Sequence, residues 1–282
     1  MKSGTLSIYL SLIPKIDQSL SHHPTRLINR VVLLVFKTMA YLLRKLKRIE
    51  FPQRSIGGTW WISRYQIEFC MGWLEPESIA WVKKLIKPDM TVIDIGAHLG
   101  YYTDLFSRLA GAYGKVYALE VSPENFPLLV KNLKSRNRFN VTTYQYPASD
   151  RSGVVNLHVS PGHSNHSLVA GYTPSEKTIA VEAVRLDDLL PTQSINFIKI
   201  DVEGHEPHVL KGMQGLIQRS RNVVLLVEYN PVALSKEYAS PQVLLNLLVE
   251  LGLEYQAILD DGSLGKLPEG NETINLLCTK SK

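Results

Sequence analysis

One stretch of the chain decides its fold: Val92-Ile93-Asp94-Ile95-Gly96-Ala97-His98-Leu99-Gly100-Tyr101-Tyr102-Thr103. It has the pattern of a buried strand, then a Gly-rich turn and the start of a helix. Gly96 and Gly100 permit a sharp turn and a close approach of the backbone to a ligand, which a Cβ atom would prevent. Asp94 at the strand end can orient the loop amides or an amine of the ligand. The stretch therefore predicts a nucleotide-cofactor site that includes Asp94, Gly96, Gly100 and Tyr101.

A second strand, at 115–119, ends at Glu120, twenty residues beyond Gly100. One carboxylate can accept hydrogen bonds from both vicinal hydroxyls of a ribose, so the two strand ends predict a nucleoside site. A dinucleotide loop has the spacing G-x-G-x-x-G, which places a pyrophosphate at the helix N-terminus, and His98 stands at its middle glycine here. The D-x-G-x-x-x-G spacing favours a cofactor without phosphates, S-adenosylmethionine (SAM), over NAD. Glu120 argues against the alternative that the glycines only close a tight turn.

Four segments together carry a resemblance to one protein family, and they occur in the order 92–103, 116–126, Ala148-Ser149-Asp150-Arg151-Ser152-Gly153 and Phe197-Ile198-Lys199-Ile200-Asp201-Val202-Glu203-Gly204-His205-Glu206. On these residues the chain resembles the FkbM family of SAM-dependent methyltransferases, over about Trp73 to Lys282. The last segment is the most distinctive. His98 departs from the family pattern, which commonly has Asn there.

The resemblance implies an α/β, Rossmann-like class I methyltransferase fold. This fold is a mostly parallel seven-stranded sheet with an antiparallel C-terminal strand, and the chain adds an N-terminal helical extension. It also implies methyl transfer to hydroxyl oxygens of sugars or polyketide-like compounds. Asp150, in the family's Ser-Asp segment, would accept a hydrogen bond from the adenine amino group, although an Asp that caps the turn at 150–153 is an equal alternative.

The segment 198–206 ends a buried strand with several titratable side chains. An alcohol is a poor nucleophile, so a methyl transfer to oxygen needs a base and accurate positioning. We predict Asp201, Glu203 and His205 as catalytic residues, with Glu203 or His205 as the base and Asp201 near the methionine end of the cofactor. Two alternatives stay open: a divalent cation bound by Asp201 and Glu203, and a capping role at the helix N-terminus, which we favour for Glu206.

Other polar residues are candidates for the acceptor site. Glu228, Tyr229 and Asn230 end the following strand. The polar loop 160–167 is long enough to cover a substrate and contains a second candidate base, His166.

The pattern from Val92 onward alternates strands and helices, which predicts a parallel sheet with helices on both faces. The first part has predicted strands at 92–95, 115–119, 141–146 and 153–159, with helices at 101–110 and 123–134. The second part has strands at 179–184, 197–200 and 223–228, helices near 206–219 and 240–251, and a final hairpin of 255–259 and 273–279. A further helix is expected at 77–86, between Pro76 and Pro88.

Charge is distributed unevenly along the 282 residues. Residues 1–50 contain nine basic and two acidic residues, a net charge of +7, whereas the rest contains 22 basic and 24 acidic residues. The slightly acidic remainder offers no electrostatic footprint for a nucleic acid, so no nucleic-acid partner is expected. Five basic residues between 26 and 48 would share one helix face, within an arc of about 40°. Residues 26–48 therefore predict a basic amphipathic helix that either contacts an anionic membrane surface peripherally or packs on the catalytic domain.

The chain divides by pattern into three parts. Residues 1–50 form the basic helical extension, 51–88 form lead-in strands and a helix that cover the site, and 89–282 form the methyltransferase domain. The lead-in contains a turn into a short strand at 57–63, and its four tryptophans (Trp60, Trp61, Trp73 and Trp81) are expected to pack in the core rather than form a wall for a sugar. The 13 apolar-rich residues at 31–43 are short for a membrane span, and no secretory cleavage site follows. Cys70 and Cys278 form no metal or disulfide pattern, which favours buried thiols in a cytoplasmic protein.

These observations predict a SAM-dependent O-methyltransferase that acts on a hydroxyl of a carbohydrate or a related small molecule, with a small-molecule or glycan acceptor and no assigned metal. A membrane-associated binding protein that keeps the fold without catalysis is the alternative.

Overall fold

The computed structural model describes residues 51–53, 60–62, 75–160, 166–175 and 177–281. The chain divides into two units, Met1–Pro76 and Glu77–Lys282. In the first unit, β1 (Phe51–Gln53) and β2 (Trp60–Ile62) form an antiparallel pair, so the short strand expected after Gly58 is present. The predicted helix at 26–48 and its membrane contact lie outside the described residues, as do Cys70 and Trp73.

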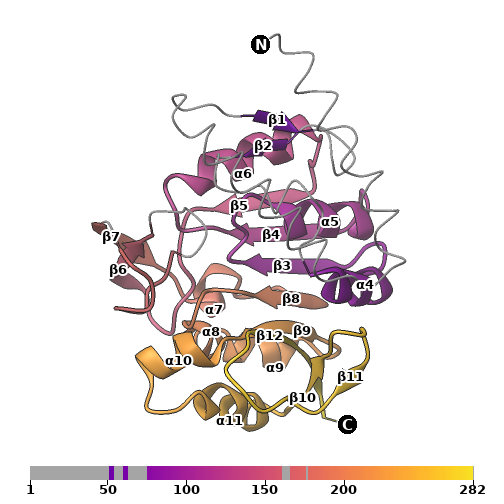
Figure 1. The fold of residues 1–282 in the computed structure, drawn as a ribbon. Helices are drawn as coiled ribbons and strands as arrows, with labels where there is room; N and C mark the ends of the chain where they lie inside the picture. The colour runs from indigo at the N-terminus through magenta and orange to yellow at the C-terminus, as the bar shows by residue number, and fades with distance from the viewer. Residues whose placement is uncertain (1–50, 54–59, 63–74, 161–165, 176, 282) are drawn as a thin grey trace, which may run out of the picture. The chain divides into compact units, whose positions relative to one another are not determined.

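The second unit is an eight-stranded sheet with helices on both faces. Its strands lie in the order β11-β10-β12-β9-β8-β3-β4-β5 (Figure 1). The strands of this sheet are β3 (Thr91–Ile95), β4 (Lys115–Leu119), β5 (Val141–Tyr144), β8 (Phe197–Ile200), β9 (Val224–Tyr229), β10 (Leu253–Ile258), β11 (Leu264–Gly265) and β12 (Ile274–Lys280). The helices are α4 (Pro76–Leu85), α5 (Tyr101–Ala110), α6 (Asn125–Ser135), α7 (Leu186–Leu189), α8 (Glu206–Lys211), α9 (Gln214–Arg219), α10 (Pro231–Glu237) and α11 (Gln242–Glu250).

The strand directions are those of a Rossmann-like class I methyltransferase. β3, β4, β5, β8 and β9 pair in parallel, and β12 runs antiparallel to both of its neighbours, β9 and β10. The predicted mostly parallel sheet with an antiparallel final strand is confirmed. Seven strands form the expected sheet, and the two-residue β11 adds an eighth at its edge.

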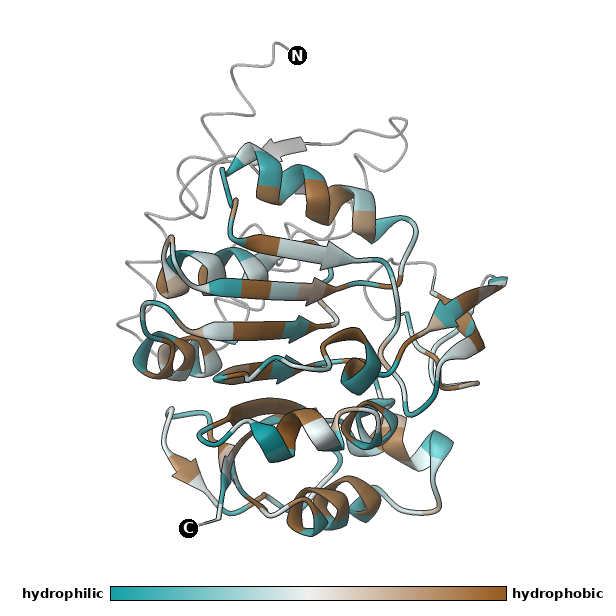
Figure 2. Cartoon of the chain, turned by 180° about the vertical axis from the view of Figure 1, so that it is seen from behind, coloured by the Kyte–Doolittle hydropathy of each residue, from teal (hydrophilic) through white to brown (hydrophobic). Residues whose placement is uncertain are grey.

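The central strands are apolar because both faces of the sheet are covered. On one face, Phe106 of α5 packs against Phe197 of β8, with ring centroids 5.7 Å apart. Side chains alternate along a strand, so Ile93 and Ile198 point to the other face, where they join a buried cluster that includes Leu216 of α9 and residues of α11. Figure 2 shows apolar stretches along the central strands, whereas hydrophilic residues occur on the helices and in the loops.

Two predicted strands, 153–159 and 179–184, lie elsewhere than expected. Residues 153–159 form β6 (Gly153–Val159), but β6 pairs only with β7 (Lys177–Ala183) in a separate two-stranded antiparallel sheet. This hairpin lies on the side toward which β3, β4 and β8 point (Figure 1). The prediction that 153–159 and 179–184 belong to the parallel sheet is therefore wrong. Gly153, Val154 and Asn156 of β6 are exposed, as expected in a separate hairpin and not in a strand that is covered on both faces.

The helix expected near 206–219 is interrupted. It forms two short helices, α8 and α9, that are separated at Gly212. A Cβ atom at Gly212 would collide with the carbonyl oxygen of Ser149, so the chain passes there without room for a side chain. This close approach fixes the loop that contains Asp150 against the end of α8. The sequence pattern did not predict α10, which begins immediately after β9 at Pro231.

Two further expectations concern single residues. Trp81 on α4 is partly buried, and its indole Nε1 donates to the carbonyl oxygen of Gly262 at 2.9 Å. Cys278 is a buried free thiol in β12. Within the described part of the chain, no helix has the length and apolar character needed to cross a membrane.

A buried carboxylate ties α5 to the end of α6. Asp104 of α5 accepts from Arg136 Nε at 2.7 Å and from Arg138 Nε at 2.6 Å, and the Arg136 side chain is almost fully buried. Burial raises the pKa of Asp104, but the two guanidinium groups more than offset it, so its pKa lies below the ordinary value. A charge at this depth is tolerated because it is paired and hydrogen-bonded.

Removal of this carboxylate should destabilise the whole unit. Asp104→Ala removes the buried carboxylate that pairs with Arg136 and Arg138, so we expect the free energy of unfolding to fall by about 3 to 5 kcal/mol in urea titrations. Asp188→Ala is the matched control: its side chain is 59% exposed and lies 3.8 Å from Arg185. A surface pair of this kind is worth less than about 1 kcal/mol, and equal losses in the two variants would contradict the argument.

Candidate functional site

The Gly-rich loop after β3 folds as the sequence predicts. Gly96 and Gly100 have φ values of +84° and +91°, a conformation that suits glycine. A Cβ atom at Gly96 would collide with the carbonyl oxygen of Asp201, and one at Gly100 would lie 2.7 Å from Leu129 Cδ1. The amides of Gly96 and Ala97 both donate to the carbonyl oxygen of Leu119, at 3.0 and 2.9 Å. The loop is therefore hydrogen-bonded to the end of β4, and no Cβ atom covers its backbone at Gly96 and Gly100.

Glu120 follows β4 and holds this loop from the other side. Its Oε2 accepts from the His98 amide, and its Oε1 accepts from the Ser122 amide, both at 2.8 Å. Burial raises the pKa of Glu120 to about 7, although the two amide hydrogen bonds act in the opposite direction. His98 itself has φ +51°, a left-handed conformation in which Asn, Asp and His are enriched. His98 can therefore adopt the backbone conformation of this loop as well as an Asn could.

Asp94 is the buried acid at the end of β3. Its Oδ2 accepts from Thr103 Oγ1 of α5 at 2.5 Å. Its Oδ1 is buried and has no hydrogen-bond partner among the described residues. Burial raises the pKa of Asp94 to about 6. An unpartnered buried oxygen beside a loop that lacks Cβ atoms fits a cofactor that carries a hydrogen-bond donor, such as the methionine amine of SAM.

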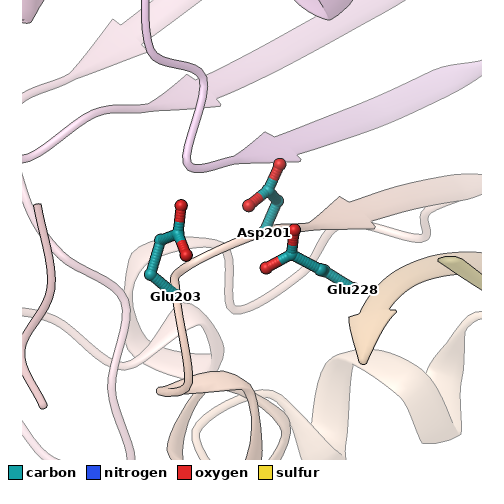
Figure 3. Close-up of side chains that lie close together, drawn as sticks. All are labelled: Asp201, Glu203 and Glu228. Atoms are coloured by element: carbon teal, nitrogen blue, oxygen red, sulfur yellow. The ribbon is translucent and has the colours of Figure 1, made fainter. Parts of the chain in front are cut away.

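Three carboxylates lie close together beyond the carboxyl ends of two neighbouring strands (Figure 3). Asp201 and Glu203 follow β8, and Glu228 is the penultimate residue of β9. One oxygen of each lies within 4.8 Å of the others, so these three residues are the set that could hold a metal ion in the described part of the chain. Burial, then the charge of Asp201, raises the pKa of Glu203 to about 8 and that of Glu228 well above its ordinary value.

Residues 94–255, more than half of the chain, match the Methyltransferase FkbM domain. This chain belongs to the FkbM methyltransferase family. Its cofactor is S-adenosylmethionine, as the Gly-rich loop and Glu120 predicted.

Among curated proteins, the FkbM chain is similar to the hexuronic acid methyltransferase AglP of Haloferax volcanii. The two are 29% identical over 140 residues, which are 49% of this chain and 55% of AglP, so this chain matches about half the length of that relative. Among solved structures, it is similar to the FkbM methyltransferase of Methylobacillus flagellatus (TM-score 0.45, 15% identity, 76% of this chain and 53% of that one). It is also similar to a SAM-dependent methyltransferase of Aquifex aeolicus (TM-score 0.41, 17% identity, 73% of this chain and 88% of that one).

A buried lysine balances the acidic cluster of this FkbM methyltransferase. Lys199 of β8 is 3% exposed, its Nζ donates to Asp201 Oδ2 at 2.6 Å, and the ammonium lies 4.7 Å from the ring centroid of Tyr102. The positive charge also lowers the pKa values of Asp94 and Glu203 against the effect of burial. The sequence assigned no role to Lys199, yet the signal was available, because residues two apart in a strand share a face.

His205 and Asp150 lie together, apart from the three carboxylates. His205 Nε2 lies 3.0 Å from Ser149 Oγ, and its ring stacks on His208 with centroids 4.4 Å apart. Burial lowers the pKa of His205 to about 3, so the ring is neutral at physiological pH. Asp150 Oδ2 lies 3.1 Å from His208 Nδ1, and this partner lowers its pKa despite the opposing effect of burial.

Glu206 has a structural role, as the sequence favoured, but it binds the loop before α8 rather than the amides of the helix itself. It is the first residue of α8, it is fully buried, and its Oε1 accepts from the amides of Val202 and Gly204, both at 3.1 Å. Burial raises its pKa to about 7. These bonds fix the loop in which Glu203 has φ +55° and Gly204 has φ +98°.

Two polar residues complete the wall around Glu203. Tyr172, from the β6–β7 connection, donates to Glu203 Oε2 at 3.0 Å, and Asn230 Nδ2 donates to the Tyr172 hydroxyl at 2.7 Å. Asn230 was predicted as an acceptor-site residue, whereas no local pattern pointed to Tyr172. Tyr229, its predicted neighbour, points to a different cavity, lined by residues 259–274. His166 Nδ1 accepts from the Ser160 amide at 3.1 Å and so links the two ends of the loop 160–167.

A side chain at Gly96 should damage the cofactor site. Gly96→Ala introduces a Cβ that collides with the Asp201 carbonyl, so we expect S-adenosylhomocysteine (SAH) to bind at least about tenfold more weakly in isothermal titration. Gly111→Ala is the control, because Gly111 also has a positive φ, of +71°, but has no atom within 4 Å of the added Cβ. Equal SAH affinity in the two variants would show that the close approach at Gly96 does not shape the site.

Cofactor affinity should depend on pH through Glu120. In the predicted site, the ribose hydroxyls would donate to the ionised carboxylate of Glu120, whose pKa burial raises to about 7. We therefore expect the SAH dissociation constant to fall by about tenfold between pH 6 and pH 8 and to level off above that. Glu120→Gln should bind weakly and remove this dependence, leaving only the change near pH 6 that Asp94 contributes. A flat profile in the unmodified protein would contradict the assignment of Glu120 to the ribose.

Proposed function

We propose that this FkbM methyltransferase transfers a methyl group from SAM to a hydroxyl oxygen of a carbohydrate. The observation that carries the proposal is the group of three carboxylates, Asp201, Glu203 and Glu228, beyond the ends of β8 and β9. Ligands of open α/β sheets bind beyond the carboxyl ends of the strands, and the cofactor loop approaches the same point at Gly96. A base thus lies beside the place where the methyl donor is expected.

The chemistry of the wall favours a neutral acceptor. Carboxylates accept hydrogen bonds from hydroxyl groups, and several hydroxyls on one ring suit several carboxylates. A carboxylate acceptor would meet repulsion from the same cluster, which contains one buried ammonium, Lys199. AglP is named for a hexuronic acid, which supports a sugar as the acceptor class, and the acidic wall of this chain favours a hydroxyl of a neutral sugar.

Glu203 is the base in this proposal. Bound SAM supplies a methyl group on a positive sulfonium, which is a strong leaving group. Glu203 accepts the proton of the acceptor hydroxyl. Asp201 holds a second hydroxyl or the cofactor amine, and the hydrogen bond from Lys199 fixes the position of Asp201. His205 is less suited, because its Nε2 lies 3.0 Å from Ser149 Oγ and burial lowers its pKa to about 3. Asp94, Gly96, Gly100, Tyr101 and Glu120 form the cofactor side, and Asp150 remains a proposed adenine partner.

The first test measures binding and then turnover. SAH and NAD are titrated separately into the purified protein, and labelled SAM is then supplied with methyl glycosides of neutral hexoses or with hexuronic acids. We expect saturable binding of SAH alone and label transfer to a neutral glycoside. Binding of SAH without transfer to any of these sugars would favour the alternative of a non-catalytic binding protein, and binding of NAD would refute the cofactor.

The role of Glu203 is tested by its amide. Glu203→Gln keeps the shape but cannot take a proton, so kcat should fall by about 10²- to 10⁴-fold while the SAH dissociation constant stays the same. Glu182→Gln, on the exposed outer part of β7, is the control. Loss of turnover on addition of EDTA to the unmodified enzyme would instead favour a cation held by the three carboxylates.

A further inference from the structure

A line of hydrogen bonds runs from the start of α10 to the Glu203 carboxylate. The Ala233 amide donates to Asn230 Oδ1 at 3.0 Å, Asn230 Nδ2 donates to the Tyr172 hydroxyl at 2.7 Å, and Tyr172 donates to Glu203 Oε2 at 3.0 Å. The line joins residues that are 31 and 58 positions apart in the sequence. It therefore connects the β6–β7 hairpin, the end of β9 and the loop after β8.

The direction of these hydrogen bonds is fixed at one end. A backbone amide can only donate, so the side-chain atom of Asn230 that faces Ala233 must be the oxygen. The other atom is then the NH₂ group, which must donate to the Tyr172 oxygen. The single hydroxyl proton of Tyr172 is left to point at Glu203. Burial raises the pKa of Tyr172 to about 12, so this proton is present at neutral pH.

The backbone of Glu203 is held separately from its carboxylate. Its carbonyl oxygen accepts from Ser167 Oγ at 2.7 Å, and the next amide, Gly204 N, is bound by Glu206. Among the described residues, the donor to the Glu203 carboxylate is Tyr172. The rotation of this side chain within the acidic cluster therefore depends on the phenol.

We propose that Tyr172 is a positioning residue for methyl transfer: its hydroxyl, oriented by Asn230, binds one oxygen of Glu203 and leaves the other oxygen aimed at the acceptor hydroxyl. This inference rests on the proposed function, in which Glu203 is the base. The hydrogen bond also stabilises the ionised form of Glu203 and so opposes the effect of burial on its pKa. Without the phenol, the carboxylate would turn toward other partners, and fewer encounters with the acceptor would be productive.

Two variants test the direction of the line. Tyr172→Phe removes only the hydroxyl, and we expect kcat to fall by about tenfold, with the KM for SAM and the SAH affinity unchanged. Asn230→Asp keeps the oxygen that caps α10 but replaces the donor with an acceptor. The Tyr172 proton should then turn to residue 230 and away from Glu203. We expect a loss of kcat of similar size in Asn230→Asp, because the line is reversed rather than broken.

The double variant separates this effect from the added charge. When Asn230→Asp is combined with Tyr172→Phe, there is no hydroxyl to redirect, so we expect the second substitution to change kcat by less than about twofold. An equal loss from Asn230→Asp with and without Tyr172→Phe would show that charge alone acts and would overturn the proposal, as would an unchanged kcat in Tyr172→Phe. Tyr113→Phe is the control, because Tyr113 is 87% exposed in the turn before β4.

Glu203→Gln in the same assay distinguishes the two levels of the argument. Unchanged turnover in Glu203→Gln would overturn the proposed base and this inference with it. A large loss in Glu203→Gln together with normal turnover in Tyr172→Phe would overturn only the role of Tyr172. A large loss in Glu203→Gln with the non-additive losses described above supports both.

Discussion

The contact between the Gly96 backbone and the carbonyl of Asp201 sets the geometry of the whole site. No side chain fits between these two points, and the Asp201 amide donates to the Ile95 carbonyl at 3.0 Å, so the ends of β3 and β8 are held together. The first of these strands leads into the cofactor loop and the second into the acidic loop. Because both loops start from one rigid junction, backbone packing rather than flexible side chains sets the predicted cofactor loop and the proposed base relative to each other.

The second constraint is electrostatic. Asp94, Asp201, Glu203, Glu206 and Glu228 lie near one another, and burial raises the pKa values of four of them. Ionised carboxylates at such density are costly unless amides or a cation compensate them. Glu206 is compensated by loop amides, Asp201 by Lys199, and Glu203 by Tyr172. Each compensating group also fixes the orientation of its carboxylate. The contacts that make burial of the acids tolerable therefore also define how the acids are arranged.

The parts of this structure that the sequence predicts are those set by local chemistry. The strands at 91–95 and 197–200 are apolar runs buried on both faces, and Gly96, Gly100 and Glu120 lie where motif spacing places them. The strands predicted at 153–159 and 179–184 were misplaced because a half-exposed strand has the same pattern at a sheet edge and in a separate hairpin. The sequence named Glu228, but its meeting with Asp201 depends on the pairing of β8 with β9, in which Ile200 lies opposite Val227. That register is a property of the fold and not of either segment alone.

The choice between Glu203 and His205 shows where adjacency in sequence stops being informative. The two residues are separated only by Gly204, whose φ of +98° and contact with Ala233 reverse the chain between them. Glu203 thereby joins the carboxylates of β8 and β9, while His205 turns back to Ser149 and His208. A glycine in this position signals that a reversal is possible, but its direction depends on α10, which packs against it. Tertiary packing at one residue therefore determines which of the two side chains joins the carboxylates, and the phenol that binds the proposed base comes from a hairpin outside the main sheet.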